Sequence, residues 1–315
     1  MKGISIVICC YNSAERLPKT LRHIAEQKFS SDIPWEVIIV NNNSNDDTKN
    51  VAEQFINKNP SIKSHVVDEF SPGLSIARHK GFHTSSYEYM LLCDDDNWLE
   101  NDYVETAFNL LEKNEDIGII GGVGEAVAET KIPDWFWQKQ NAYAVGKLFS
   151  TGGYVKYVYG AGMVLRKSVY MAALNKGFVS LLSDRKGKEL SSGGDIELCY
   201  IYQLMGYKIF QSDKLKFKHF VSDSKLTSEY KNKINKGFAK TILVLRPYDL
   251  VVNKRNESAH SLWFKEYCYI AREAITNLFH PKEDWTYLKS SLKLMLTHRK
   301  EFCKNIIAIR TFAAY

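Results

Sequence analysis

The first half of the chain alternates apolar runs with polar loops and helix-like segments, and this alternation restricts the possible folds more than any other feature. Residues 4–10 and 35–40 are apolar and rich in β-branched side chains, which is typical of strands buried on both faces. Each run precedes a segment with helical spacing, at residues 15–28 and 48–58. This order predicts an α/β fold with a mostly parallel sheet, right-handed crossovers and flanking helices.

The alternation weakens after about residue 125. Before that point we predict strands at residues 65–67, 89–93 and 117–123 and helices at 75–84 and 102–113. After it we predict a helix at 195–205, short strands at 208–210 and 214–219, and a helical, basic pattern from about 226. We therefore place a domain boundary at residue 225, with an α/β domain at 1–225 and an amphipathic helical region at 226–315.

Charge is distributed unevenly along the 315 residues. The net charge is +6, but residues 1–230 carry −3 and residues 231–315 carry +9. A basic, amphipathic region with aromatic side chains suits an anionic membrane surface. Packing on the same chain or on a second copy is the main alternative, and we expect no nucleic-acid partner.

The cysteines and the apolar runs indicate where the chain resides. Six cysteines are present, none at C-x-x-C spacing, and several lie in strand-like runs, so we expect buried, reduced thiols in a cytosolic protein. No apolar run approaches the ~18 residues that a membrane span needs. The run at residues 4–10 is too short for a signal peptide. We therefore expect a cytoplasmic location. Peripheral binding to the inner face of the membrane is compatible with it.

Three consecutive carboxylates, Asp94, Asp95 and Asp96, directly follow the predicted strand at residues 89–93. Such carboxylates repel one another unless a cation is bound or water surrounds them. Hard oxygen ligands at a strand end suit Mg²⁺ or Mn²⁺, and a solvated acidic turn is the alternative. Because ligands of open α/β sheets bind beyond the carboxyl ends of strands, residues 11–12 and 41–47 belong to the same edge.

Three further residues are candidates for chemistry, each with a plainer alternative. Arg78 suits contact with a diphosphate or with the acidic cluster, and a surface arginine is the alternative. Asp195 follows two glycines and opens a helix, so it is either a general base or an N-cap. His219 follows a strand-like run, and taken alone it is more often structural.

In order along the chain, six segments resemble the family 2 glycosyltransferases. This resemblance covers about residues 3–222 and implies the GT-A nucleotide-diphospho-sugar transferase fold, here with a C-terminal helical extension. It also implies an inverting enzyme, of hexosyl- or N-acetylhexosaminyl-transferase type. The matching segments are residues 5–12, 37–46, 73–78, 91–96, 194–197 and His219.

The resemblance assigns the donor side of the site. Tyr11 and Asn12 would line the nucleotide pocket, and Asn41 and Asn42 would face the base. Family members often have Asp at the first of the latter two positions. Asn41 departs from that pattern, so UDP is expected as the nucleotide on family grounds only.

The resemblance also assigns the diphosphate and metal side. Arg78 would contact the diphosphate or hold Asp94. Asp94 and Asp95 would lie near the ribose, while Asp96 would bind Mn²⁺ or Mg²⁺ and His219 would complete the metal shell.

Asp195 matches the catalytic base of the inverting enzymes. The family commonly has Glu-Asp at this point, and this chain has Gly194-Asp195, which removes one carboxylate and keeps the base. A carboxylate at this place takes the proton of an acceptor hydroxyl as it attacks the sugar. The implied partners are a nucleotide-sugar donor and a glycan or lipid-linked acceptor, to which a membrane-bound basic tail would bring the enzyme.

An aromatic segment at residues 133–137 lies between the donor half and the base. Rings stack on the apolar faces of sugars, so we assign Trp135 and Trp137 to the acceptor side, with a core or lid plug as the alternative. Two other functions compete with the transferase. A sugar-nucleotide nucleotidylyltransferase should have a glycine-rich, basic loop after the first strand, where this chain has residues 10–13. A catalytically silent sugar-nucleotide or glycan-binding module would not need Asp94, Asp96 and Asp195 together.

Overall fold

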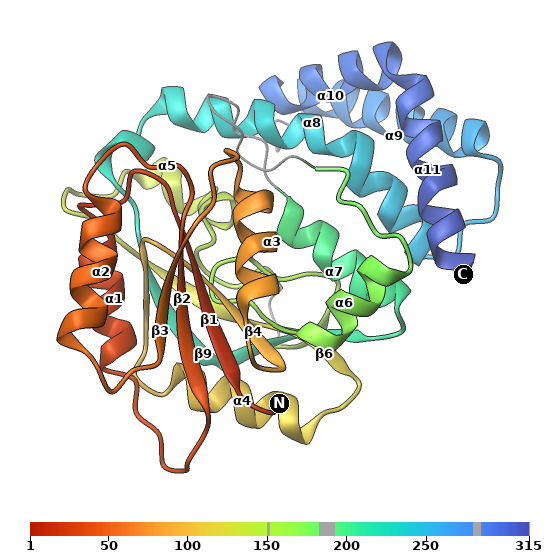
Figure 1. The fold of residues 1–315 in the computed structure, drawn as a ribbon. Coiled ribbons are helices and arrows are strands. Elements are labelled where there is room, and N and C mark those ends of the chain that lie inside the picture. The colour runs from red at the N-terminus through yellow and green to blue at the C-terminus, as the bar shows by residue number, and fades with distance from the viewer. Residues whose placement is uncertain (150–151, 183–192, 280–284, 315) are drawn as a thin grey trace.

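Half of the sheet is parallel, as the alternation in the sequence predicts. The structure is a computed structural model that describes residues 1–149, 152–182, 193–279 and 285–314. Four strands lie parallel in the order β3-β2-β1-β4, as Figure 1 shows. Their bounds are β1 (Ile4–Cys10), β2 (Trp35–Asn41), β3 (Ser64–Asp68) and β4 (Tyr89–Asp94).

The other half of the sheet is mixed. It continues from β4 in the order β8-β6-β9-β5, and β7 pairs with β9. β8 runs antiparallel to β4 and β6, β6 runs parallel to β9, and β5 and β7 run antiparallel to β9. The two short strands expected at 208–210 and 214–219 form one strand. The bounds are β5 (Asn97–Leu99), β6 (Ile117–Val127), β7 (Gly153–Val155), β8 (Val164–Arg166) and β9 (Lys208–Phe220).

Helices cover both faces of the sheet because side chains of a buried strand alternate between its faces. Ile4 and Ile6 of β1 pack in the core that α1, α2 and α4 cover, whereas Val7 packs in the core that α3, α6 and α7 cover. In Figure 1, α1 and α2 stand on one side of β1 to β3 and α3 stands on the other. These helices are α1 (Leu17–Ala25), α2 (Thr48–Lys58), α3 (Leu74–Thr84), α4 (Tyr103–Lys113), α6 (Lys167–Asn175) and α7 (Gly194–Leu204).

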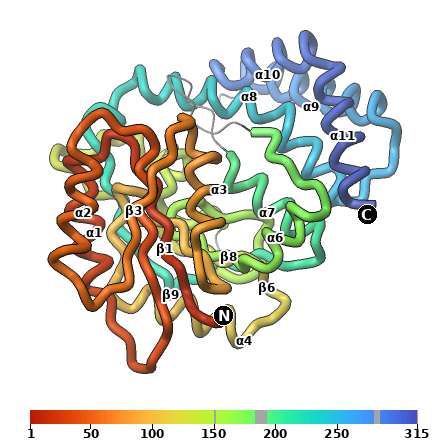
Figure 2. The backbone as a smooth tube through the Cα atoms, in the orientation of Figure 1, coloured from red at the N-terminus to blue at the C-terminus, as the bar shows by residue number. Residues whose placement is uncertain are grey.

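Four helices form the C-terminal region, as the sequence pattern predicts. They share an apolar core that includes Ile242, Leu262, Met295 and Phe302, one residue from each helix. Figure 2 shows the last three of these helices, in blue, away from α1 and α2, and the first one, in cyan, running across the top of the view toward them. They are α8 (Ser228–Val252), α9 (Ala259–Phe279), α10 (Trp285–Thr297) and α11 (Arg299–Ala314).

Three short elements complete the fold, and the structure also bears on the expected cysteines and membrane spans. The short elements are α5 (Asp134–Trp137) and the 3₁₀ turns η1 (Gln140–Tyr143) and η2 (Asp223–Lys225). All six cysteines are free, but the expectation that they are buried is wrong for Cys268, which is exposed on α9. Within the described ranges, no helix combines the length and the apolar character that crossing a membrane requires.

Candidate active site

The carboxyl ends of β1, β2 and β4 meet at one edge of the sheet. Cys10 pairs with Asn41, and Cys9 pairs with Asp94, so the loops that follow these strands start side by side. This register is the reason why polar residues from three separate segments gather there. The polar edge expected from the sequence is therefore present.

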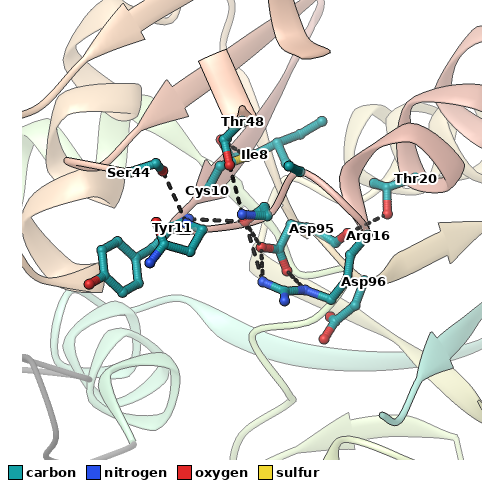
Figure 3. A network of polar contacts seen from close by, with 12 residues as sticks. Ile8, Cys10, Tyr11, Arg16, Thr20, Ser44, Thr48, Asp95 and Asp96 are labelled. Atoms are coloured by element: carbon teal, nitrogen blue, oxygen red, sulfur yellow. Dashed lines mark hydrogen bonds and ion pairs between the residues drawn. The ribbon is translucent and has the colours of Figure 1, made fainter. Parts of the chain in front are cut away.

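Asp95 ties this edge together (Figure 3). Its carboxylate accepts hydrogen bonds from Ser13 and from Arg16, whose Nη2 lies 2.9 Å away, and Thr20 donates to its backbone carbonyl at 2.8 Å. Burial and the neighbouring Asp96 raise the pKa of Asp95, while Arg16 opposes that shift. Through these contacts Asp95 connects the loop after β1 to the acidic loop. Contact of Asp95 with a ribose stays a prediction.

Asp96 sits between two cationic or basic side chains. Its Oδ2 accepts from Lys225 Nζ at 2.8 Å, and its Oδ1 lies 3.3 Å from His219 Nε2. The antiparallel pairing of β5 with β9 sets Asn97 opposite His219, which brings the imidazole to the adjacent Asp96. Burial alone would raise the pKa of Asp96, but Lys225 and His219 hold this pKa well below its usual range.

The residues predicted to hold a metal fit such an ion in part. Carboxylate oxygen and imidazole nitrogen from Asp96 and His219 suit Mn²⁺ or Mg²⁺, with water and phosphate oxygens as the remaining ligands. In the described part of the chain, no group of three or more His, Cys, Asp or Glu side chains gathers as a metal site. The ammonium of Lys225 also occupies one side of Asp96, so an ion bound by Asp96 would compete with Lys225 for this carboxylate.

Asp195 lies at the start of α7, and its carboxylate contacts the loop that precedes β8. Asp195 Oδ2 accepts from the backbone N–H of Gly160 at 2.8 Å. Gly193 is the N-cap of α7, with φ +118°, so the alternative of Asp195 as the N-cap is wrong. A methyl group added at Gly160 would lie 3.1 Å from Arg78 Nη2 and 3.1 Å from Asp195 Cβ. Gly160 thus permits the close approach of a guanidinium and a carboxylate from distant segments.

A cavity of about 340 Å³ contains these groups. Arg78, Asp94, Asp195 and His219 all line it, so the fold brings four of the expected site residues to one space. Lys225, which the sequence reasoning missed, lines it as well. The remaining wall is largely aromatic and apolar, and it includes Tyr143, Tyr157, Tyr159, Tyr230, Ile234 and Phe238.

The polar residues predicted to contact a nucleotide hold loops in place. Asn12 has a left-handed backbone with φ 48°, and its side-chain oxygen accepts from Asn45 N–H at 2.9 Å. The Asn42 amide donates to the carbonyls of Glu69 and Ser71, at 3.0 and 2.8 Å, and accepts from the N–H of Gly73. Contact of these two asparagines with a nucleotide stays a prediction.

Asn41 has a carboxylate partner that the sequence reasoning did not single out. Its Nδ2 donates to Asp68 Oδ1 at 2.9 Å, and Asp68 also pairs with Lys49 at 2.7 Å. Asp68 ends β3, the strand beside β2, so the strand-end rule could have found it. Tyr11, in contrast, is exposed and extends from the end of β1.

The aromatic segment α5 lies beside the cavity. Phe136 is fully buried, Trp135 packs near Tyr143 with ring centroids 6.5 Å apart, and Trp137 is exposed. Neither tryptophan is among the residues lining the cavity. Trp135 therefore supports a lining residue, and the acceptor role of Trp135 and Trp137 stays a prediction.

Comparison with solved structures shows the fold. S. aureus TarS superposes with a TM-score of 0.55 at 16% identity, over 97% of this chain and 54% of that one. The mannosyltransferase PcManGT from Pyrobaculum calidifontis, solved with GDP-Man and Mn²⁺, has a TM-score of 0.59 at 14% identity, over 93% and 86% of the two chains. The expected GT-A fold with C-terminal helices is confirmed.

Comparison with curated sequences shows the family. The glycosyltransferase GlyA of Streptococcus pneumoniae is 30% identical over 117 residues, which are 37% of this chain but only 16% of GlyA. The poly(ribitol-phosphate) β-N-acetylglucosaminyltransferase TarP of Staphylococcus aureus is 24% identical over 239 residues, 75% of this chain and 68% of TarP. The profile named Glycosyl transferase family 2 matches residues 5–173, more than half of the chain. The chain therefore belongs to glycosyl transferase family 2.

Proposed function

We propose that this chain transfers a sugar from a nucleoside-diphosphate donor to a hydroxyl group of a glycan or lipid-linked acceptor, with inversion at the anomeric carbon. The observation that carries the proposal is the carboxylate of Asp195, which shares the 340 Å³ cavity with Arg78 and Asp94. A carboxylate held in this way takes the proton of an attacking hydroxyl. Asp195 at the start of α7 and Asp94 at the end of β4 line this cavity from separate elements, which is compatible with attack from the face away from the diphosphate.

The chain's own residues would handle the charge of the leaving group. Arg78 is buried and lines the cavity, so its guanidinium suits a diphosphate oxygen. Asp96 and His219 would hold Mn²⁺ or Mg²⁺, which supplies positive charge to the departing diphosphate when bound. The Mn²⁺ of the archaeal mannosyltransferase supports this assignment at the level of the fold.

The donor we favour is a UDP-sugar carrying a hexose or an N-acetylhexosamine. One of the similar TarS structures contains UDP-GlcNAc, and TarP is named as an N-acetylglucosaminyltransferase. The aromatic wall formed by Tyr143, Tyr157 and Tyr230 suits a sugar ring of either donor or acceptor. A cytoplasmic location is part of the proposal, and the six free cysteines support it.

Residues 1–225 remain our proposed catalytic domain, with residues 226–315 as a helical region. The helix α8 of that region sends Tyr230, Ile234 and Phe238 into the cavity of Asp195. A full transferase test therefore needs both parts of the chain.

The Asp195→Asn substitution tests the proposal. It should lower turnover by about 10²–10⁴-fold, because a general base contributes on that order, and it should leave donor binding nearly intact. Donor binding is measured by thermal shift with UDP, UDP-sugars and GDP-mannose, each with and without Mn²⁺. Asp213→Asn, which removes an exposed carboxylate on β9, is the matched control and should keep full turnover.

The products separate the competing functions. A transferase releases nucleoside diphosphate and a glycosylated acceptor, whereas a nucleotidylyltransferase releases pyrophosphate from a nucleoside triphosphate and a sugar phosphate. A silent binding module would bind the donor and release neither product. Near wild-type turnover by the Asp195→Asn variant would refute the role of Asp195 as the base.

A further inference from the structure

Helix α9 has two apolar faces, and only one of them packs inside the protein. Leu262, Ile270 and Ala274 are buried against the other C-terminal helices. The opposite face carries Phe264, Cys268, Ile275, Leu278 and Phe279, which we call the outer stripe. These positions recur at helical spacing, so they lie along one side of α9.

The outer stripe is strongly exposed. Phe264, Ile275, Leu278 and Phe279 are 58%, 60%, 63% and 74% exposed, and Cys268 is exposed too. Single exposed apolar side chains are ordinary, but a contiguous row of large ones marks an interaction site. Helix α9 therefore has a buried apolar face and an exposed one. Packing of the C-terminal helices accounts only for the buried face.

Basic residues border the outer stripe, and no exposed carboxylate accompanies it on α9. Lys265 and Arg272 are exposed beside the stripe, and Lys265 also pairs with Glu257, which precedes α9, at 2.9 Å. The two acidic residues of α9 are withdrawn, because Glu266 is buried against Arg246 at 2.6 Å and Glu273 is half-buried.

The neighbouring helix α10 repeats the pattern. It packs against α9 and exposes Trp285, Leu296, Lys289 and Lys293, and its sequence contains no acidic residue. The exposed surfaces of α9 and α10 thus combine large apolar side chains with four cations.

We propose that the outer stripe docks on an anionic lipid surface. An amphipathic helix that lies in the membrane plane inserts its apolar face at the boundary of headgroups and acyl chains, and basic residues beside it attract anionic headgroups. A second copy of the chain fits less well as the occupant, because pairing of two such surfaces would bring like charges together. This interaction is independent of the transferase activity proposed above.

Vesicle binding of the full chain tests the docking. The protein should sediment with phosphatidylcholine vesicles that contain phosphatidylglycerol and stay in solution with phosphatidylcholine alone. The Ile275→Ser/Leu278→Ser double variant should weaken binding by at least about tenfold, because it removes apolar area without changing charge. The Lys265→Gln/Arg272→Gln variant should weaken it on the order of tenfold, since each cation near the surface contributes.

Matched controls exclude general effects of charge and folding. The Lys58→Gln/Lys80→Gln variant removes the same charge from exposed sites on α2 and α3 and should bind like the wild type. Thermal unfolding should show that all variants fold. A bimane label on Cys268, the one exposed cysteine of the six, should shift to the blue when anionic vesicles are added.

Three results would overturn the proposal. The first is a lack of binding to anionic vesicles. The second is vesicle binding that is unchanged in both the Ile275→Ser/Leu278→Ser variant and the Lys265→Gln/Arg272→Gln variant. The third is a dimer in light scattering without lipid, combined with bismaleimide crosslinking of Cys268 to the Cys268 of a second copy, which would identify that copy as the occupant of the stripe.

Discussion

Replacing Lys225 by Met tests the competition between an ammonium group and a metal ion for Asp96. Lys225 Nζ lies 2.8 Å from Asp96 Oδ2, and the side chains of Lys225 and Asp96 are 22% and 6% exposed. Removing one partner of a buried ion pair costs about 3–5 kcal/mol. Because Lys225 is partly exposed and His219 remains 3.3 Å from Asp96, we expect about 2–3 kcal/mol here. At about 2 °C per kcal/mol for a chain of this size, the unfolding temperature without metal should fall by about 4–6 °C.

The same substitution should strengthen metal binding. In the wild type a metal ion must displace the Lys225 ammonium from Asp96, and in the Lys225→Met variant it need not. If the whole 2–3 kcal/mol opposes metal in the wild type, the variant should bind Mn²⁺ about 30–150-fold more tightly. Mn²⁺ titrations followed by electron paramagnetic resonance measure this affinity directly, and thermal unfolding with Mn²⁺ should recover the lost stability.

The control is Lys216→Met, which removes an exposed lysine from β9 and should change neither the stability nor the Mn²⁺ affinity. Equal Mn²⁺ affinity in the wild type and the Lys225→Met variant would refute the competition. Mn²⁺ binding that survives Asp96→Asn unchanged would refute the assignment of the metal to Asp96.

Three further substitutions follow from particular contacts. Gly160→Ala should lower kcat by about 100-fold, because its methyl group would displace Arg78 or Asp195, and unchanged kcat would contradict the shared cavity. Tyr230→Ala should raise the acceptor KM by about tenfold, since Tyr230 lines the cavity; steady-state kinetics with varied acceptor decides. Glu36 is fully buried, and its Oε2 lies 2.6 Å from Lys63 Nζ. Burial alone would raise the pKa of Glu36, but the hydrogen bonds from Lys63, Ser86 and Ser5 outweigh burial and hold this pKa below its usual value. The ionised Glu36 therefore contributes its stability above the ordinary glutamate pKa and loses it as pH falls through the lower folded value. Between about pH 6 and about pH 3, the free energy of unfolding should fall more for the wild type than for Glu36→Gln, as measured by urea unfolding.

The strand ends of the first half could be predicted because local patterns determine them. Buried strands, the polar residues that follow them and the helices between them all appear within short stretches of sequence. The parallel register then brings Asn41 next to Cys10 and Asp94 next to Cys9, which is enough to locate the polar edge. Asp68 is harder to single out, because β3 is short and only half-buried, so its sequence has a weak strand pattern.

Contacts between distant segments could not be predicted in the same way. Gly160 is an ordinary loop glycine in the sequence, and its importance comes from Arg78 and Asp195 approaching it from α3 and α7. Lys225 is one of many lysines, and it reaches Asp96 because β9 pairs with β5 and η2 follows β9 directly. Such proximity depends on antiparallel pairing late in the chain, where the sequence alternation had already weakened.

Helix α8 connects the cavity with the C-terminal bundle, and this connection determines how the tail can be studied. Its first half places Tyr230, Ile234 and Phe238 in the cavity wall, while Ile242 and Leu250 farther along pack in the core shared with α9, α10 and α11. Deleting residues 255–315 would therefore expose that core face of α8 and disturb the cavity wall at its other end. A loss of vesicle binding or of turnover in a truncated chain would report damage to α8 as readily as loss of a docking surface. Substitutions on the outer stripe, where the side chains already face solvent, remove the apolar contact and leave α8 packed, so they separate the two roles of the C-terminal region.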